Sequence, residues 1–303
     1  MRFVKAHGAG NDFVLIPDLE DRITLTPPFV RALCAQHTGL GADGVIRLAP
    51  PASAREGDVF MDYWNADGSI AEMCGNGVRC VAKYAMDRGL VGGDTVEVST
   101  RAGVKLVRIV DRWGDGTVAT AAVDMGIPRL SGERQVDVSP SRLSAPEVPG
   151  HQVVTLEHVV VTVTTVSMGN PHAVVLVDDV ARAPVAAWGP VIACDDAFPR
   201  GTNVEFIAVE ARDHVVGRIW ERGVGETLAS GTGASAMAVA AHALGLADRL
   251  VQVDLPGGIL EIDWTGKSLW VKGPAAEVAT GELDRGWVDS NAILAFNDRD
   301  DAS

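Results

Sequence analysis

Short runs of β-branched and other apolar residues recur along the chain, and many of them alternate with polar positions. Alternation with a period of two is typical of strands that bury one face. The sequence is therefore expected to be rich in β-sheet. The runs predict strands over residues 95–99, 104–110, 117–123, 159–166, 173–177, 204–209, 251–253, 259–263 and 269–272.

Helices are expected at fewer places, and residues suited to helix ends mark them. A helix is predicted over residues 27–37, because Thr26 suits the N-cap, Pro27 suits the first helical position and Gly39 follows the last turn. Three further helices are predicted over residues 75–88, 184–194 and 231–244.

The predicted helix over residues 231–244, GTGASAMAVAAHAL, differs from the others because small or apolar side chains occupy nearly all of its faces. Only Thr232, Ser235 and His242 are polar exceptions. A helix that is apolar all round must be buried all round. In a strand-rich chain, we expect it to lie inside a curved sheet.

Two segments of the chain align without a gap at an offset of 156 residues, namely 63–77 and 219–233. The alignment places Cys74 opposite Ser230. Upstream, GNDF at 10–13 has a counterpart in GNPH at 169–172, at an offset of 159 residues. Because both matches occur in the same order at nearly the same offset, they predict a duplicated domain.

The repeat divides the chain into two expected domains. Residues 1–126 together with about 279–298 form the first, and residues 127–278 form the second. The polar, Pro- and Ser-rich stretch 126–150 is expected to be a linker or a long surface connection. The last residues, DRDDAS, are expected to form a solvated tail.

Composition limits the classes of function. The 303 residues carry a net charge of −14, which argues against binding to nucleic acid or to an anionic membrane surface. A hydrophobic content of 47% is ordinary for a globular protein, and no apolar run reaches the ~18 residues of a membrane span. Four cysteines are too few for a disulfide framework in a chain of this length. These features favour a reduced, cytoplasmic enzyme.

Each copy of the repeat has the pattern X-Gly-X-Gly at the predicted start of a helix. The free N–H groups and the dipole of a helix N-terminus favour an anion, although such glycines also serve close helix–strand packing. Cys74 stands at one of these starts, where the thiolate is favoured, so its pKa is expected below the ordinary ~8.5. An inert buried role fits Cys34, Cys80 and Cys194 better. Cys74 and Cys80 lack the close spacing of zinc ligands, so no metal is expected.

At these positions the sequence resembles the diaminopimelate epimerase family. The motifs that carry the resemblance run from residue 1 to about 282, and they are KAHGAGNDFVLI, WNADGSIAEMCGNGVRC, VSMGNPHAVV, TNVEFI, ERGVGETLASGTGASA, DLPGGILEIDW and VKGPAAEV. The resemblance implies an α+β fold of two pseudo-symmetric domains, each a β-barrel-like sheet wrapped round a central helix, with the active site between them.

The activity that the resemblance implies is epimerisation of LL-2,6-diaminoheptanedioate to the meso form, on the route to lysine and peptidoglycan precursors. Members of this family use no pyridoxal phosphate, so no cofactor is expected. The implied partner is a small-molecule substrate, with neither nucleic acid nor membrane. A working unit of one chain and a homodimer both stay open.

Residues are carried over from the family by motif. The two acid–base positions fall on Cys74 and Ser230, with His172 and Glu221 as helpers that move protons. Arg222 suits a distal carboxylate, because a guanidinium can bind one through two hydrogen bonds. The implied substrate contacts are Asn11, Asn65, Gly75, Asn76, Asn170, Asn203, Glu221, Arg222, Gly231 and Thr232.

The chain departs from the family at position 230, where the pattern requires Cys and the sequence has Ser. A serine hydroxyl is a poor base near neutral pH unless another group activates it. Three explanations fit: an engineered Cys→Ser change, a natural one-base enzyme, or a protein that binds an amino acid without turnover. We favour the first, because the rest of the motif is intact. Alternatives for the function are a racemase or dehydratase of another amino acid, and a catalytically silent amino-acid-binding protein.

Overall fold

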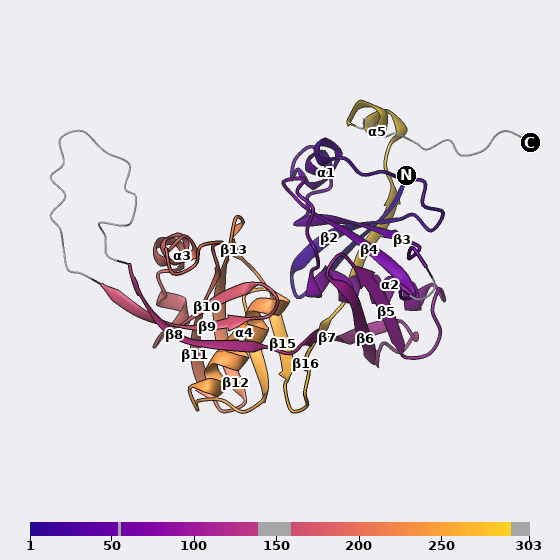
Figure 1. Cartoon of the computed structure of the whole chain (residues 1–303). Helices are drawn as coiled ribbons and strands as arrows, with labels where there is room; N and C mark the ends of the chain where they lie inside the picture. The colour runs from indigo at the N-terminus through magenta and orange to yellow at the C-terminus, as the bar shows by residue number, and fades with distance from the viewer. Residues whose placement is uncertain (54–55, 139–158, 292–303) are drawn as a thin grey trace, which may run out of the picture. The chain divides into compact units, whose positions relative to one another are not determined.

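The computed structural model describes residues 1–53, 56–138 and 159–291. The chain forms two compact units, one of Met1–Asp124 with the chain from Lys272 onward, the other of Met125–Val271. The chain passes from one unit to the other within two strands, β7 and β16 (Figure 1).

The first unit contains nine strands or helices before the crossover and two after it. They are β1 (Arg2–Gly8), β2 (Asn11–Pro17), α1 (Pro27–Cys34), β3 (Gly44–Ala49), β4 (Val59–Asn65), α2 (Gly75–Asp87), β5 (Thr95–Thr100), β6 (Gly103–Arg112), β7 (Val118–Gly126), β17 (Ala276–Glu282) and α5 (Arg285–Asn291).

The second unit follows a similar order of elements. They are β8 (Arg129–Asp137), β9 (Val160–Ser167), β10 (Pro171–Leu176), the 3₁₀ turn η2 (Val180–Arg182), α3 (Val185–Ala193), β11 (Asn203–Ala211), β12 (His214–Glu221), β13 (Gly225–Thr227), α4 (Gly231–Ala243), β14 (Leu250–Leu255), β15 (Gly258–Asp263) and β16 (Leu269–Pro274).

Strand pairing is the same in both units. In the first, β2 is parallel to β3, β3 antiparallel to β4, β4 parallel to β5 and β5 antiparallel to β6. In the second, β10, β11, β12, β14 and β15 repeat that sequence of directions. The register repeats too, because Phe13 pairs with Gly44 and His172 pairs with Asn203, each at the offset of 159 residues seen in the sequence. The predicted α+β fold of two pseudo-symmetric halves is confirmed.

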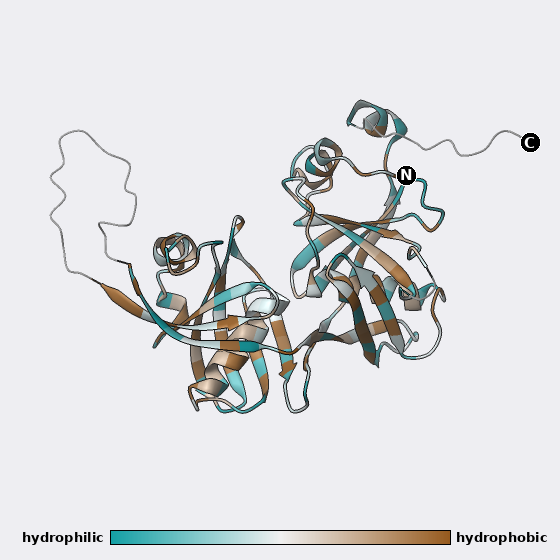
Figure 2. Cartoon of the chain, in the orientation of Figure 1, coloured by the Kyte–Doolittle hydropathy of each residue, from teal (hydrophilic) through white to brown (hydrophobic). Residues whose placement is uncertain are grey.

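The α4 helix is buried nearly all round, as its composition predicts. Ten of its thirteen residues are buried, and it contacts β9, β10, β11, β12, β14 and β15. Figure 2 shows its mostly apolar and neutral surface among those strands. Because small side chains cover the helix, strands can approach it from several sides, which makes α4 the central helix of its unit.

In the first turn of both α2 and α4, a glycine permits close contact with a strand. A Cβ at position 77 would lie 2.8 Å from Ile46 Cδ1 and Met61 Cε, and a Cβ at position 233 would lie 2.9 Å from Ile219 Cδ1. These distances are shorter than real Cβ contacts. The second glycine of each Gly-X-Gly pattern therefore serves packing, which fixes where each helix N-terminus lies.

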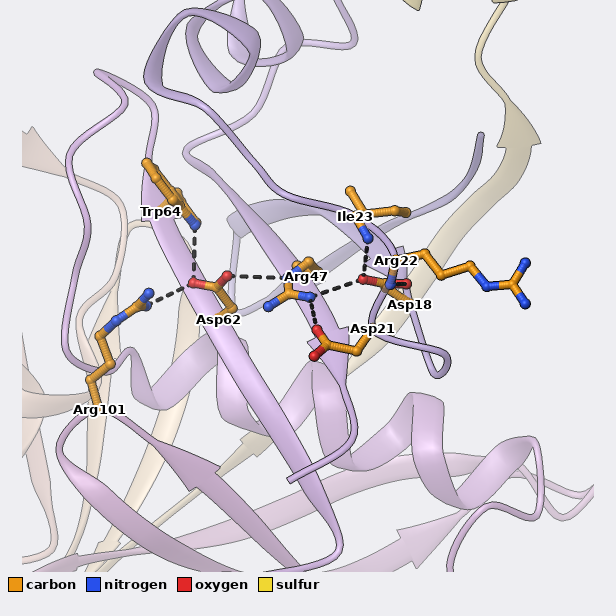
Figure 3. A network of polar contacts seen from close by, with 8 residues as sticks. All are labelled: Asp18, Asp21, Arg22, Ile23, Arg47, Asp62, Trp64 and Arg101. Atoms are coloured by element: carbon orange, nitrogen blue, oxygen red, sulfur yellow. Dashed lines mark hydrogen bonds and ion pairs between the residues drawn. The ribbon is translucent and has the colours of Figure 1, made fainter. Parts of the chain in front are cut away.

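A network of hydrogen bonds and ion pairs is centred on β3 and β4 of the first unit (Figure 3). The carboxylate of Asp62 accepts hydrogen bonds from Arg47 Nε at 3.2 Å, from Arg101 at 2.7 Å and from Trp64 Nε1 at 3.0 Å. Arg47 also binds Asp18 at 2.9 Å. Asp62 and Asp18 are both buried, and these hydrogen bonds compensate for the desolvation of their carboxylates.

Two expectations about local structure are wrong. Residues 129–137, which the sequence assigned to the 126–150 connection, form β8 and pair with β9 along its whole length; residues 139–150 lie outside the described part. The helix predicted over 27–37 ends at Cys34, because Ala35 is extended.

The other three predicted helices are confirmed, each within one residue at its ends. Each of the nine predicted strands is present, most of them extended by one to three residues. The strands β1, β2, β3, β4, β12, β13 and β17, the turn η2 and the short helix α5 lie outside the predicted ranges. In the described part of the chain, no helix is long and apolar enough to cross a membrane.

Candidate functional site

The first cluster of candidate residues surrounds the N-terminus of α2, in the first unit. Cys74 is the N-cap residue, with φ −138° and ψ 119°. Its thiol does not cap the helix and instead donates to Asn11 Oδ1 at 3.5 Å. Helix starts leave N–H groups without partners inside the helix, so this end can receive an anion.

Asn11 connects the other groups of this half-site. Its Oδ1 accepts from both Cys74 Sγ and Asn76 Nδ2, the latter at 3.4 Å, while its Nδ2 donates to Asp43 Oδ2 at 2.9 Å. Burial raises the pKa of Asp43, and the neighbouring Asp12 carboxylate adds to this effect. Asp12 is in turn paired with Lys5. The structure thus brings three predicted residues, Asn11, Cys74 and Asn76, into one hydrogen-bonded group.

Asn65 lies in a tight turn at the end of β4. Its Nδ2 donates to Ser69 Oγ at 3.0 Å, and Asp67 accepts from the backbone and the hydroxyl of the same serine. These hydrogen bonds hold the turn, so the Asn65 side chain has a structural task in addition to any contact with a ligand.

The second cluster surrounds the N-terminus of α4, in the second unit. Ser230 is the N-cap residue, with φ −138° and ψ 128°, nearly the angles of Cys74. Its hydroxyl accepts from the backbone N–H of Gly233 at 3.2 Å and lies 3.3 Å from Thr232 Oγ1. Asn170 Nδ2 donates to the same threonine at 3.4 Å. Ser230, Thr232 and Asn170 therefore form one group.

His172 lies behind this group and is fully buried. Its Nδ1 is 2.7 Å from Glu205 Oε1, and its Nε2 is 3.1 Å from Asn170 Oδ1. Both ring nitrogens are thus engaged by neighbours within the protein. Burial raises the pKa of Glu205, while the adjacent His172 opposes that rise. In this geometry, His172 orients the amide of Asn170 so that its N–H groups face Thr232.

Of the remaining predicted residues of the second unit, Gly231 is the first residue of α4, and the others lie at the start of β11 and at the end of β12. Asn203 Oδ1 accepts from the backbone N–H of Arg222 at 2.9 Å, and the Arg222 guanidinium donates to the carbonyl of Arg200. Arg222 is exposed. Glu221 Oε1 accepts from Thr227 Oγ1 at 2.6 Å. An exposed guanidinium beside the strand ends is available to a carboxylate ligand.

The four cysteines differ in environment, and none is in a disulfide. Burial raises the pKa of Cys34 and that of Cys80 to about 12, which fits the expected inert role. The expectation is wrong for Cys194, which follows the last turn of α3 and is exposed. Within residues 1–53, 56–138 and 159–291, no three His, Cys, Asp or Glu side chains are arranged to hold a metal ion.

Asp43 and Glu205 of these clusters, and Arg79 on α2, were not found from the sequence. For Glu205 and Arg79 the available signal was a charged residue inside an otherwise apolar strand or helix, because such a residue needs a partner when buried; Asp43 lies in the loop before β3 and has no such signal. Glu205 interrupts the run VEFI, and Arg79 follows Gly-Asn-Gly-Val on a helix that is buried on most sides. The signal indicates burial but does not identify the partner.

The chain is similar to known proteins over most of its length. A family model described as diaminopimelate epimerase matches residues 3–130 and 164–283. The diaminopimelate epimerase of Pelotomaculum thermopropionicum is 44% identical over 287 residues, covering 93% of this chain and 98% of the relative. That of Heliobacterium modesticaldum is 44% identical over 289 residues, covering 93% and 99%. The crystal structure of a probable proline racemase from Agrobacterium radiobacter has the same fold, with a TM-score of 0.66, 16% identity and coverage of 94% and 93%.

Proposed function

Because this chain belongs to the diaminopimelate epimerase family, we propose that it acts on 2,6-diaminoheptanedioate and exchanges the proton at one α-carbon. The product of epimerisation, the meso isomer, serves lysine and peptidoglycan-precursor synthesis, which would place the enzyme in the cytoplasm. No cofactor is part of the proposal.

The observation that carries the proposal is the pair of matched helix starts. Residues 74 and 230 are the N-cap residues of α2 and α4, with φ equal and ψ within 9°. Each is followed by Gly-X-Gly and lies in the same place in its repeat. The N-terminus of such a helix can stabilise the negative charge that develops when an α-proton leaves a carbon next to a carboxylate.

Inversion requires a base that takes the proton from one face of the carbon and an acid that returns a proton to the other. We assign the base to Cys74, as a thiolate, and the opposite role to position 230. The thiolate becomes a thiol as the C–H bond breaks, and the electron pair stays on the substrate until a proton arrives. The side-chain amides of Asn11 and Asn76 lie near the N-cap of α2, and that of Asn170 lies near the N-cap of α4.

The serine at position 230 limits what this chain can do. Its hydroxyl is tied to Gly233 N–H and Thr232, and a neutral hydroxyl is a weak acid and a weak base near pH 7. We therefore propose that Cys74 exchanges the proton of one stereoisomer, with little inversion. A racemase or dehydratase of another amino acid and a catalytically silent amino-acid-binding protein stay the alternatives.

The experiment is proton exchange followed by NMR in D₂O, with LL- and meso-substrate separately, for the parent and for Ser230→Cys under reducing conditions. We expect the parent to exchange slowly, and from one isomer only. Ser230→Cys should interconvert the isomers at least ~10²-fold faster than the parent, since a general acid–base group contributes ~10²–10⁴-fold.

Cys74→Ala in the Ser230→Cys background is the control, and it should abolish both exchange and inversion. A parent that already inverts as fast as Ser230→Cys would show that residue 230 is not the second acid–base group. Binding without exchange in either protein would favour the silent amino-acid-binding protein.

A further inference from the structure

Arg79 is a fully buried charged residue on α2, little more than one turn after Cys74, and its side chain is 0% exposed. Its guanidinium donates to three neutral oxygens: Asn76 Oδ1 at 2.8 Å, the Pro274 carbonyl at 3.2 Å and the Gly75 carbonyl at 3.5 Å. Within the described ranges of the chain, Arg79 makes no ion pair with a carboxylate.

A buried guanidinium without an anion is costly. Burial lowers the pKa of Arg79, yet a guanidinium keeps its charge at any pH near neutral. Lys83, one turn further along the same helix, shows the usual solution, because it is paired with Asp87 at 2.7 Å. The unpaired charge of Arg79 therefore suggests an anion that forms when the protein works.

Two thiols lie within electrostatic range of Arg79, those of Cys74 and Cys80. Cys80 is fully buried, and burial raises its pKa to about 12, so it stays a thiol. Cys74 is partly exposed and stands at the positive end of the helix dipole. Cys74 is thus the thiol that can become the anion.

A chain of amides also connects Arg79 with Cys74. Arg79 binds Asn76 Oδ1, which leaves Asn76 Nδ2 to donate to Asn11 Oδ1, the same oxygen that accepts from Cys74 Sγ. The charged groups around this oxygen on the neighbouring elements are Asp43, Asp12 and Lys5, which are linked to Asn11 and to one another. Because the Arg79 guanidinium donates to Asn76 Oδ1, the Asn76 amide keeps its oxygen toward Arg79 and its Nδ2 toward Asn11.

We propose that Arg79 is a positioning residue of the first half-site: it fixes the amide of Asn76, and its charge favours the thiolate of Cys74. The second effect has a mechanistic consequence only if Cys74 is the base of the proposed function. The equivalent position of the other repeat is Ser235, which donates to the Gly231 carbonyl at 2.7 Å. Only the first copy of the repeat therefore has a charged residue at this position.

The test is the pH dependence of Cys74 alkylation by iodoacetamide, which needs no turnover. The parent background is Cys194→Ser, since Cys194 is exposed, and mass spectrometry identifies the modified cysteine. Arg79→Gln should raise the pH midpoint of Cys74 alkylation by about one unit, which is a tenfold lower thiolate fraction below that midpoint. Arg79→Lys should keep the midpoint within about 0.3 units, because it keeps the charge.

The lysine variant also tests the orientation of Asn76. A lysine loses the planar guanidinium that binds Asn76, Gly75 and Pro274 together, so proton exchange in the Ser230→Cys background should fall at least ~5-fold with the alkylation midpoint unchanged. Equal exchange in the Ser230→Cys protein with and without Arg79→Lys would overturn the orienting role, and this arm stands even if Arg79→Gln does not fold.

Lys83→Gln is the matched control, a change of a buried cation on the same helix that is already paired with Asp87. It should lower stability without moving the midpoint of Cys74. A folded Arg79→Gln protein with the parent midpoint would overturn the electrostatic role. A shifted midpoint with no proton exchange in any variant would support the electrostatic role of Arg79 while contradicting the proposed function.

Discussion

The pair of Glu205 and His172 should be the most sensitive polar contact of the second unit. Both side chains are 0% exposed and their atoms are 2.7 Å apart. Removal of one partner leaves the other buried without its hydrogen bond, which costs ~1–3 kcal/mol, and more when the group left behind is charged. We therefore expect Glu205→Ala to lower the free energy of unfolding by ~2–3 kcal/mol. Glu205→Gln keeps a neutral hydrogen bond and should cost only about 1 kcal/mol.

The control is Glu226→Ala, in the same unit. Glu226 forms an ion pair with Arg218 at the same distance of 2.7 Å, but both side chains are partly exposed. Partly exposed pairs contribute ~0–1 kcal/mol, so this variant should differ little from the parent. The assay is urea unfolding of the full chain, followed by tryptophan fluorescence, together with hydrogen exchange of β10 and β11.

The pH dependence gives an independent check. Burial raises the pKa of Glu205 above its ordinary value, so its contribution is complete at a pH below that ordinary value and is lost as pH rises through the raised pKa. Glutamine does not titrate. The stability difference between the parent and Glu205→Gln should therefore shrink as pH rises from about 4.5. Equal losses for Glu205→Ala and Glu226→Ala would refute the reasoning, and so would a difference that grows with pH.

Two further predictions concern packing and recognition. Gly77→Ala should destabilise the first unit by ~1–3 kcal/mol, because its Cβ would lie 2.8 Å from Ile46 and Met61; an unchanged Tm would show that these side chains yield freely. Arg222→Ala should weaken calorimetric binding of diaminopimelate by ~1.5–3 kcal/mol, and that of an analogue without the distal carboxylate far less; equal weakening would exclude a contact between Arg222 and that carboxylate.

Alternation of apolar and polar residues does not separate the predicted strands from the missed ones, because β10 was predicted from a continuous apolar run, whereas β1 and β12 alternate in burial and were missed. The strands β2 and β3 are buried on both faces, so their runs FVLI and GVIRLA lack a clear period of two. The opposite case is β8, whose residues are mostly exposed and polar. Its pairing with β9 rests on backbone hydrogen bonds, which no side-chain pattern of β8 itself indicates.

The sequence motifs located the candidate site residues but did not predict the contacts between their side chains. The repeat placed residues 74 and 230 at equivalent helix starts, and the structure gives them nearly the same backbone angles. The contacts of Asn11 with Asp43, and of His172 with Glu205, join segments that are about 30 residues apart in the chain. Such contacts depend on the strand register, which one sequence does not specify.

The two repeats have the same backbone arrangement but differ in side chains that determine charge. This difference has its largest expected effect at Ser230. Its hydroxyl accepts from Gly233 N–H and so caps α4, whereas the thiol of Cys74 leaves α2 without a side-chain cap. A sulfur atom is a weak acceptor, and loss of a serine cap typically costs ~1 kcal/mol. Ser230→Cys should therefore lower the Tm slightly while it raises the rate of inversion. Of serine and cysteine, the residue that better caps the helix is the one less able to transfer a proton, so a gain in activity without any loss of stability would mean that the cap contributes nothing.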